Sequence, residues 1–357
     1  MATNKVKSDI MIKIYVLGFD QALASAITGV IDLFALAGVT WNRIQQQDTV
    51  MAFHVQLASH QGNNIRCINN LQLGAHCSFA DIFRQLEIET ATDNISNNIS
   101  NNRPINNIVI VPTIGGPIQQ VLDNNPELIR LLNKAQQAGW TIAGNCTGNF
   151  LLAEAGILDG KSATTHWGFT TEFQQRYPQI DLHAEQLITR DDNIFCAGGG
   201  IAWFDWGLHI IERNVDFETA MQTAKAFVID YRRDSQLSYS LMRIAKPHQD
   251  EMVKSIQAQI EHDCITTLSI GALAEEHNVS QRTLIRRFNS ALGMPPNTYL
   301  QSVRIEHARK MLEESDFNID TIINNIGYED SSSFRRLFKK KTGLTPTEYR
   351  NRFSRRL

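Results

Sequence analysis

The chain has few cysteines and no pattern that would join them. Five of its 357 residues are cysteine, an odd number, and no two of them form a Cys-x-x-Cys pair. This argues against a disulfide framework and against a zinc site, and it favours a reducing compartment such as the cytoplasm. We therefore expect a cytoplasmic protein with no metal site and no cofactor.

Long apolar runs are also missing. The longest, such as residues 108–111, are far too short to span a membrane. Met1 is followed by polar residues and lysines rather than by the apolar core of a secretory signal. We expect no membrane partner.

Positive charge is scarce in the first two thirds of the chain. Residues 1–239 hold 16 Lys and Arg against 23 Asp and Glu, a net charge of −7, whereas residues 240–357 hold 18 against 14, a net charge of +4; together they give −3. This asymmetry is typical of a nucleic-acid-binding tail domain joined to an acidic domain. The alternative is a solvated basic terminal helix.

Strand-like and helix-like segments alternate over the first 230 residues. Such alternation predicts a doubly wound, flavodoxin-like α/β domain, which we place at residues 9–232, followed by a polar linker at 233–250. The predicted strands cover residues 11–17, 52–58, 108–111 and 141–144, and the predicted helices cover 25–37, 79–86, 126–138, 147–155, 201–212 and 217–228.

One predicted strand runs directly into a helix through the small residues around Cys146. This arrangement is typical of a nucleophile elbow, in which the thiol lies beside a helix N-terminus that would lower its pKa. His166, twenty residues further on, could reach the sulfur. A Cys/His nucleophilic site and a buried remnant in a ligand pocket are both compatible with the pattern.

Residues 251–357 predict an all-α domain with two helix-turn-helix motifs. Each motif is a short apolar helix, a tight turn, a capping Ser280 or Asp330, and a helix rich in arginine; Arg282 and Arg335 are 53 positions apart. A long helix over 298–312 would hold the two arginine-rich helices at a fixed distance. Double-stranded DNA is the expected partner.

The helical period separates core residues from DNA-facing residues in both motifs. Leu284 and Phe288 in the first, and Phe334 and Phe338 in the second, should face the core. The residues expected on the outer faces, at base edges or phosphates, are Gln281, Arg282, Ile285, Arg286, Ser331, Ser332, Arg335 and Arg336. Arg286 and Arg336 could each bind a guanine, or contact phosphates without reading sequence.

The C-terminal hundred residues resemble the AraC/XylS family of transcription regulators. The resemblance rests on residues 279–288, on 327–338 and on the closing 343–350 segment. One departure is Ile323, where the family usually has a small alanine, which would loosen the packing of that helix.

Residues 11–230 resemble the PfpI/ThiJ (class I glutamine amidotransferase-like) superfamily, on segments 146–160 and 163–167. Both halves in this order resemble the GlxA-type subfamily of AraC regulators. Enzymes of the superfamily keep an acidic residue near the position of Ala26, where this chain has none; Asp20 and Asp32 are the nearest. The resemblance therefore implies that Cys146 and His166 are vestigial and that the domain is a sensor rather than an enzyme.

We expect the effector to contact Cys146, Thr147, His166 and Trp167. The resemblance implies a small nitrogenous metabolite, an amino acid or an amine. Trp203 and Trp206 could add a cation–π cage, although core packing of their helix explains them as well. The function expected is that of a homodimeric transcriptional activator, with RNA polymerase as a further candidate partner. The alternatives are a cysteine-dependent amidase or glyoxalase-like enzyme, and a redox sensor acting through Cys146.

Overall fold

The computed structural model describes residues 11–96, 107–231, 233, 235–240, 248–263, 268–328 and 330–355, with residues 90–96 described by their backbone alone. The chain divides into two compact units after Gln236, inside the segment predicted as a linker. Cys264 lies outside the described residues.

The N-terminal unit is built on a seven-stranded sheet with the strand order β10-β11-β7-β6-β1-β2-β5. All neighbours pair in parallel except β10 and β11, which form an antiparallel edge that the sequence analysis did not predict. The strands are β1 (Ile12–Leu17), β2 (Phe53–Ser59), β5 (Cys77–Ser78), β6 (Ile108–Val111), β7 (Thr141–Asn145), β10 (Ile188–Asp191) and β11 (Ile194–Ala197). Two small sheets pair β3 (Ile65–Arg66) with β4 (Gln72–Leu73), and β8 (Ser162–Ala163) with β9 (Asp181–Leu182).

The central strands are buried on both faces, which explains their apolar sequences. All four residues of β6 are buried, as are all five of β7. The chain moves from β1 to β2 on one side and returns to β6 on the other, so the strand order reverses at β1. In doubly wound sheets, the loops beside such a reversal form the binding crevice. The predicted flavodoxin-like class is therefore confirmed.

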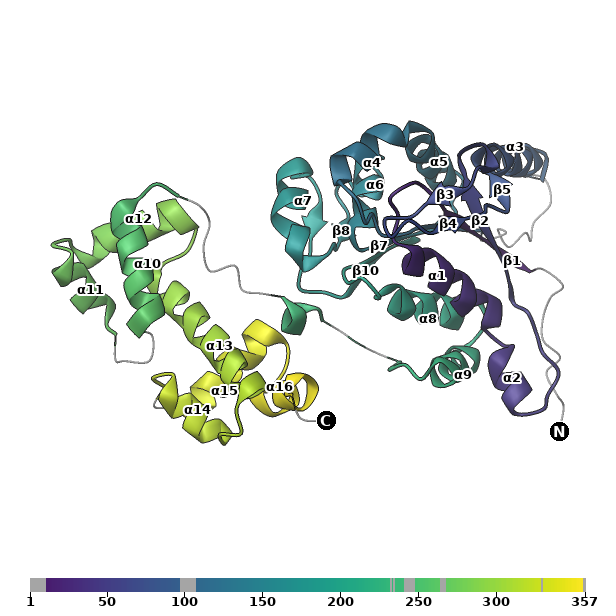
Figure 1. The fold of residues 1–357 in the computed structure, drawn as a ribbon. Helices are drawn as coiled ribbons and strands as arrows, with labels where there is room; N and C mark the ends of the chain where they lie inside the picture. Colours follow the sequence, from purple (N-terminus) through teal and green to yellow (C-terminus); the bar gives the residue numbers. More distant parts are fainter. Residues whose placement is uncertain are drawn as a thin grey trace. The chain divides into compact units, whose positions relative to one another are not determined.

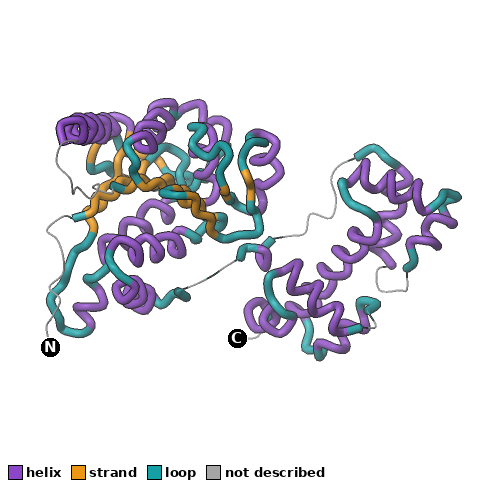
Figure 2. Tube along the Cα trace, turned by 180° about the vertical axis from the view of Figure 1, so that it is seen from behind, coloured by secondary structure: helices purple, strands orange, loops and turns teal. Residues whose placement is uncertain are grey.

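Helices cover both faces of this sheet (Figures 1 and 2). One face carries α1 (Ala24–Leu36), α2 (Thr40–Ile44), α8 (Trp203–Asn214) and α9 (Phe217–Phe227), and the other carries α3 (Phe79–Ser96), α4 (Ile118–Asn124), α5 (Pro126–Gln137) and α6 (Asn149–Glu154). A further helix, α7 (Thr170–Arg176), follows the His166 segment.

The tryptophans of α8 belong to the core of the N-terminal unit. Trp203 and Trp206 are 3% and 0% exposed, and a Cβ added to Gly29 of α1 would lie 2.3 Å from the Trp203 ring. A cation–π cage needs ring faces open to a ligand, which these buried rings do not offer. Core packing is the interpretation that the structure supports.

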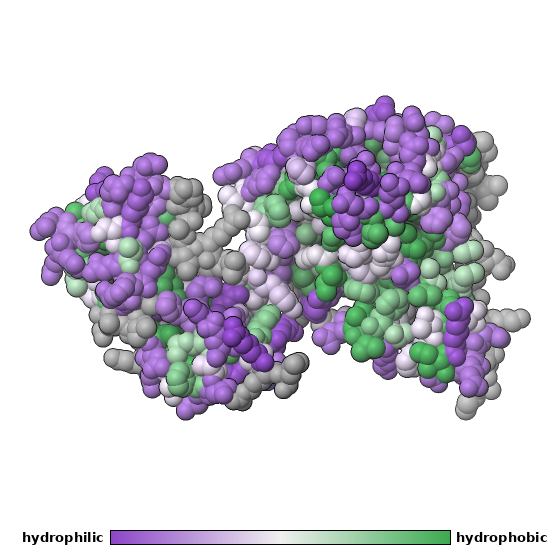
Figure 3. Space-filling model, viewed as in Figure 1, coloured by the Kyte–Doolittle hydropathy of each residue, from purple (hydrophilic) through white to green (hydrophobic). Residues whose placement is uncertain are grey.

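The C-terminal unit is helical in its described residues. Its helices are α10 (Glu251–Asp263), α11 (Ile270–Glu276), α12 (Gln281–Leu292), α13 (Pro296–Glu314), α14 (Ile319–Asn325), α15 (Ser331–Thr342) and α16 (Pro346–Phe353). The face seen in Figure 3 is mostly hydrophilic. None of the helices described in either unit is long and apolar enough to cross a membrane.

Two separate hydrophobic cores share α13. Tyr299 and Val303 belong to the core of α10–α12, while Ile305 and Leu312 belong to the core of α14–α16. With 19 residues, α13 is about 28 Å long and contains the long helix predicted at 298–312. Ile323 is 1% exposed inside the second core, so the larger side chain is accommodated there.

Candidate nucleic-acid interface and cysteine elbow

The first arginine-rich helix, α12, starts, packs and ends as its sequence predicts. The hydroxyl of Ser280 accepts a hydrogen bond from the Thr283 amide at 3.2 Å, which caps the helix. Leu284 and Phe288 are fully buried. Gly293 ends the helix at a φ of 73°, a left-handed conformation that favours glycine.

The outer face of α12 is open to solvent. Gln281, Arg282, Ile285 and Arg286 are all exposed, Ile285 by 39%. Within the described residues, neither Arg282 nor Arg286 has an ion-pair partner. Their guanidinium groups are therefore available for phosphates or base edges.

Arg287, the next residue along, has a different environment. Its guanidinium binds both carboxylate oxygens of Asp250, at 2.8 and 2.5 Å, and this partner lowers the pKa of the Asp250 carboxyl. Asp250 also accepts a hydrogen bond from Val253 in the first turn of α10. Arg287 therefore fixes α12 to α10. The sequence analysis missed this pair because the partners are 37 positions apart.

The second arginine-rich helix, α15, is capped, packed and ended in the same way as α12. Asp330 accepts hydrogen bonds from the amides of Ser332 and Ser333, at 2.9 and 3.2 Å. Phe334 and Phe338 are buried, as predicted. Gly343 ends the helix with a φ of 77°.

The predicted DNA-facing residues of α15 divide into two groups. Ser332 and Arg336 are exposed, whereas Ser331 and Arg335 are half-buried. Arg335 donates to the carboxylate of Asp320 in α14 at 2.8 Å. Its charge is therefore partly compensated, while Arg336 has no ion-pair partner among the described residues.

A buried arginine that the sequence analysis did not single out organises the second half of this unit. Arg309 of α13 is 6% exposed and donates to the Tyr349 hydroxyl at 2.8 Å. It also donates to the carbonyls of Ser238 (2.9 Å) and Ser240 (2.6 Å), in and just after the short turn Leu237–Tyr239. The first described residues of the C-terminal unit are thus attached to α13.

The backbone around Cys146 forms the sharp turn expected of a nucleophile elbow. Cys146 follows the buried strand β7 and has a φ of 57°, a left-handed conformation that is strained for a residue with a side chain. A Cβ added to Gly148 would lie 2.3 Å from the Pro112 carbonyl, so only glycine fits there. The Thr165 hydroxyl donates to the Cys146 carbonyl at 3.1 Å.

The thiol of Cys146 does not have the lowered pKa that the sequence pattern predicted. The side chain is 5% exposed, and burial raises the pKa of its thiol to about 11. Hydrogen bonds from Thr147 and Thr113 offset only part of this effect. After β7, the chain forms a 3₁₀ turn, Cys146–Gly148, followed by the six-residue helix α6.

His166 has its own local partner. Its Nδ1 accepts a hydrogen bond from the Gly168 amide at 3.0 Å, and burial lowers the pKa of the imidazole. Its ring lies 5.1 Å from that of Trp167, between centroids. Among the described contacts there is no hydrogen bond between Cys146 and His166.

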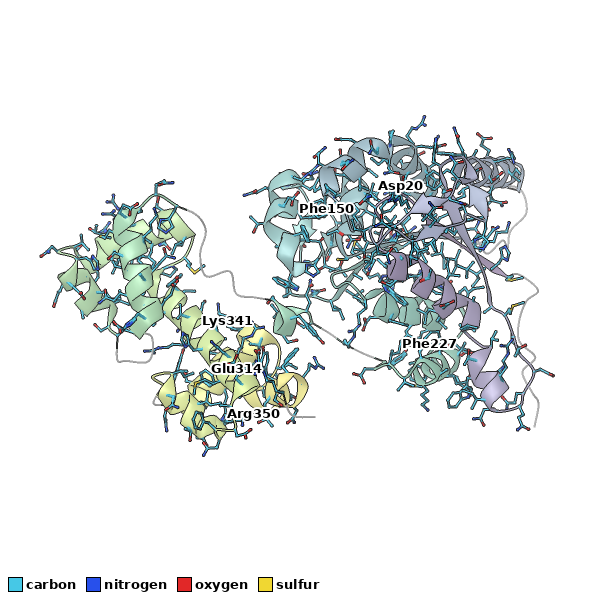
Figure 4. All side chains as sticks on the ribbon, viewed as in Figure 1. Asp20, Phe150, Phe227, Glu314, Lys341 and Arg350 are labelled. Carbon is cyan, nitrogen blue, oxygen red and sulfur yellow. The ribbon has the colours of Figure 1, made fainter. Side chains whose placement is uncertain are left out.

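The carboxylates nearest to the predicted acidic position serve other parts of the fold. Ala26 is fully buried in α1. Asp20 (labelled in Figure 4) is exposed and accepts a hydrogen bond from the Arg66 amide at 2.8 Å. Asp32 is exposed on α1.

Each unit matches a known protein family or domain. Residues 13–213 match the DJ-1/PfpI family, and residues 273–352 match a helix-turn-helix domain. The first match covers more than half of the chain. The chain belongs to the DJ-1/PfpI family.

Several relatives with similar sequences are transcriptional regulators. The chain is 30% identical over 227 residues to the HTH-type transcriptional regulator CdhR of Pseudomonas aeruginosa, covering 63% of this chain and 67% of the relative. It is 25% identical over 224 residues to the HTH-type transcriptional regulator GlxA of Rhizobium meliloti, covering 62% and 68%. The matches to such regulators span between 61% and 69% of the relatives' own length.

A solved structure of an AraC family transcriptional regulator from Pseudomonas putida is similar over 60% of this chain and 99% of its own. The identity is 19% and the TM-score is 0.46, so the family assignment rests on the sequence matches.

The last residue of the N-terminal unit, Gln236, contacts the segment that carries His166. The side-chain amide of Gln236 donates to the carbonyls of Thr165 and Ala184, at 2.9 and 2.8 Å, and its oxygen accepts from the Trp167 amide at 3.3 Å. Gln236 is 2% exposed. Because it lies 70 positions from His166, no local pattern could have linked it to this site.

Proposed function

We propose that this protein is a transcriptional regulator that binds double-stranded DNA through α12 and α15 and responds to a small molecule in its DJ-1/PfpI domain. One observation carries the proposal. Two capped helices, joined by the shared helix α13, expose Arg282, Arg286 and Arg336 without ion-pair partners in the described residues. Such helices fit the major groove, and about 34 Å separates successive turns of the duplex.

The test is footprinting with the full-length protein on the DNA upstream of its own gene. The expected result is a protected site that is lost in the Arg286→Ala/Arg336→Ala double variant. Arg84→Ala is the matched control, because Arg84 is an exposed arginine on α3 of the other unit. Absence of any protected site, or equal protection by the double variant, would contradict the proposal.

The proposed effector site is the elbow, with Cys146, Thr147, His166 and Trp167 as contacts and a small nitrogenous metabolite as ligand. The half-buried rings of His166 and Trp167 support it, since they lie beside the 38% exposed Phe169 and could cover an apolar or cationic group. A thermal-shift series with amines on the full-length protein tests it. Trp167→Ala should abolish a shift that Trp41→Ala, in α2, retains.

We further propose that the DJ-1/PfpI domain is not an enzyme. A buried thiol with a raised pKa, a His166 whose Nδ1 is occupied, and the missing carboxylate near Ala26 all support this. The competing cysteine-dependent amidase or glyoxalase-like activity would show as turnover that is lost in Cys146→Ser. The Cys146 backbone conformation is the observation that favours this second candidate.

A redox sensor acting through Cys146 needs an accessible thiolate. The expected result is slow alkylation of Cys146 at neutral pH, rising only as the pH approaches the thiol pKa of about 11. Peptide mass spectrometry distinguishes this cysteine from the others. Rapid alkylation at neutral pH would contradict both the buried thiol and the non-enzymatic assignment.

We propose that the protein acts as a homodimeric activator, with RNA polymerase as a further partner. Apolar side chains that are exposed near α8 and α9 support a contact through this unit: Ile201, Val215, Phe217 and Val228, the last 91% exposed. Light scattering should give a dimer, and Val228→Asp should weaken it. A monomer at all concentrations would exclude the dimer.

A further inference from the structure

The DJ-1/PfpI domain contains a cavity that none of the predicted elbow residues lines. Its volume is about 530 Å³, and it lies between the antiparallel edge β10–β11 and α8. Tyr231 and Arg233, which follow α9, form part of its wall. Small-molecule sites have volumes of about 300–1,000 Å³, so this cavity is large enough for a metabolite.

Charges of both signs line the cavity. Arg233 forms a two-point ion pair with Asp205, whose side chain is 4% exposed. Glu212 of α8 accepts a hydrogen bond from the Tyr231 hydroxyl at 2.6 Å through Oε2. His209 Nδ1 lies 3.9 Å from the same carboxylate oxygen. This carboxylate is therefore half-buried and held in place by neighbouring side chains.

Arg190 supplies the remaining lining cation. Its Nε donates to the Asp192 carbonyl at 3.0 Å, and its guanidinium lies over the Phe195 ring, 5.5 Å from the centroid. Among the described residues, no hydrogen bond or ion pair uses the two terminal nitrogens of this guanidinium, which could bind a ligand. The pKa of Arg213 is lowered, mainly by burial and also by repulsion from the nearby guanidinium of Arg190. An anion bound at Arg190 would relieve that repulsion.

We propose that this cavity is a second small-molecule site and that it binds an amino-acid-like zwitterion, with the ligand's carboxylate at Arg190 and its ammonium group at Glu212. A simple anion would face the carboxylates of Asp205 and Glu212, and a simple cation would face Arg190 and Arg233. A ligand carrying both charges satisfies both sides, and charge-assisted hydrogen bonds to a guanidinium and a carboxylate are the strong ones. This site is separate from the elbow and goes beyond the function proposed above.

The cavity lies beside the segment that ends the N-terminal unit, so a bound ligand would contact that segment. Tyr231 and Arg233 belong to the segment that leads to Gln236, the last residue of the N-terminal unit. A ligand that engages Glu212 competes for the group that holds Tyr231. Occupancy therefore acts directly on the segment that precedes the DNA-binding unit.

The test uses the full-length protein and each proteinogenic amino acid as a probe, first by thermal shift and then by calorimetry. We expect at least one amino acid to raise the melting temperature by a shift that Arg190→Gln removes, while its decarboxylated amine and its deaminated acid give no shift that depends on Arg190. Arg190→Gln and Glu212→Gln should each raise the Kd for this amino acid about tenfold or more. Glu212→Gln keeps an oxygen that can accept from Tyr231, so the wall is retained.

Arg176→Gln is the matched control, because Arg176 also lies over an aromatic ring, that of Tyr177 at 5.7 Å, but outside the cavity. It should leave the Kd unchanged. The proposal is wrong if no amino acid binds, or if the Arg190 and Glu212 variants bind as tightly as the unaltered protein. Binding lost in His166→Ala but kept in Arg190→Gln would place the ligand at the elbow, which overturns this site and leaves the proposed function intact. Footprinting without ligand tests the DNA-binding function separately.

Discussion

The two helix-turn-helix halves of the C-terminal unit share one frame but differ in charge. α12 and α15 each begin at a capping side chain, bury three residues spaced one turn apart and end at a left-handed glycine. In its last turn, α15 carries Lys339, Lys340 and Lys341, whereas the last turn of α12 carries no basic residue. The frame therefore depends on caps and core residues, and the outer residues are free to differ.

This difference indicates a division of work between α12 and α15, in which the two helices contribute differently to DNA binding. The exposed set of α12 includes the apolar Ile285, which suits contact with base edges such as the thymine methyl. The lysines of α15 suit phosphate contacts, which add affinity without sequence information. We expect α12 to supply more of the specificity and α15 more of the salt-sensitive affinity. The predictions below test this comparison.

The largest effect on stability should come from removing one large side chain from a hydrophobic core. Phe338→Ala removes a fully buried ring from the core of α14–α16 and should cost about 3–5 kcal/mol of stability. Because the core of α10–α12 is separate, hydrogen exchange should show α15 opening while α12 stays protected. Equal loss of protection in both helices would mean that the two cores unfold as one.

Sequence reading by α12 is tested with Arg286→Ala. We expect a loss of about 1–3 kcal/mol of discrimination between the cognate site and a mutated site, with a much smaller change on unrelated duplex. Lys340→Ala in α15 is the comparison, and it should weaken binding to both duplexes equally. Binding titrations at one fixed salt concentration measure both, and equal behaviour of the two variants would remove the proposed division of work.

The caps should differ in strength. Asp330 accepts two amide hydrogen bonds and Ser280 accepts one, so Asp330→Ala should destabilise more than Ser280→Ala, within about 0.5–2 kcal/mol for each. Chemical denaturation of the two variants gives the comparison. A larger loss in the serine variant would contradict it.

The smallest effect per residue is expected from the lysines. Changing Lys339, Lys340 and Lys341 to glutamine should lower the salt slope of DNA binding by up to about 0.9 for each phosphate that the protein no longer neutralises. The matched change is Lys254→Gln in α10, a lysine paired with Glu251, which should leave the slope unchanged. An unaltered slope in the triple variant would show that these lysines do not face the duplex.

Much of this organisation follows from local sequence. Ser280 and Asp330 could be recognised as caps, and the buried pairs such as Leu284 and Phe288 could be predicted, because both depend on residues within one or two turns. The partners of Arg287 and Arg335 could not be predicted, since ion pairs across 37 and 15 positions depend on tertiary packing.

The elbow shows the same limit. The turn at Cys146 was correctly predicted from its small neighbours, but the predicted direction of the thiol pKa was wrong. Burial raises that pKa, hydrogen bonds from Thr147 and Thr113 offset only part of the rise, and none of this is visible in the local pattern. The antiparallel edge β10–β11 was missed as well, and with it the cavity beside α8.

Gln236 has a consequence for how the two units communicate. Its side chain is tied to the elbow loop, and Ser238, two residues later, is tied to Arg309. The tether between the last anchor of one unit and the first anchor of the other is therefore minimal. A molecule that displaced Gln236 from its partners would move the upstream anchor to Ser235, whose hydroxyl donates to the Glu185 carbonyl at 2.9 Å, and the tether would lengthen by one residue. A ligand that contacts Trp167 in the proposed elbow site would thus act on the residue that sets the free length of this tether.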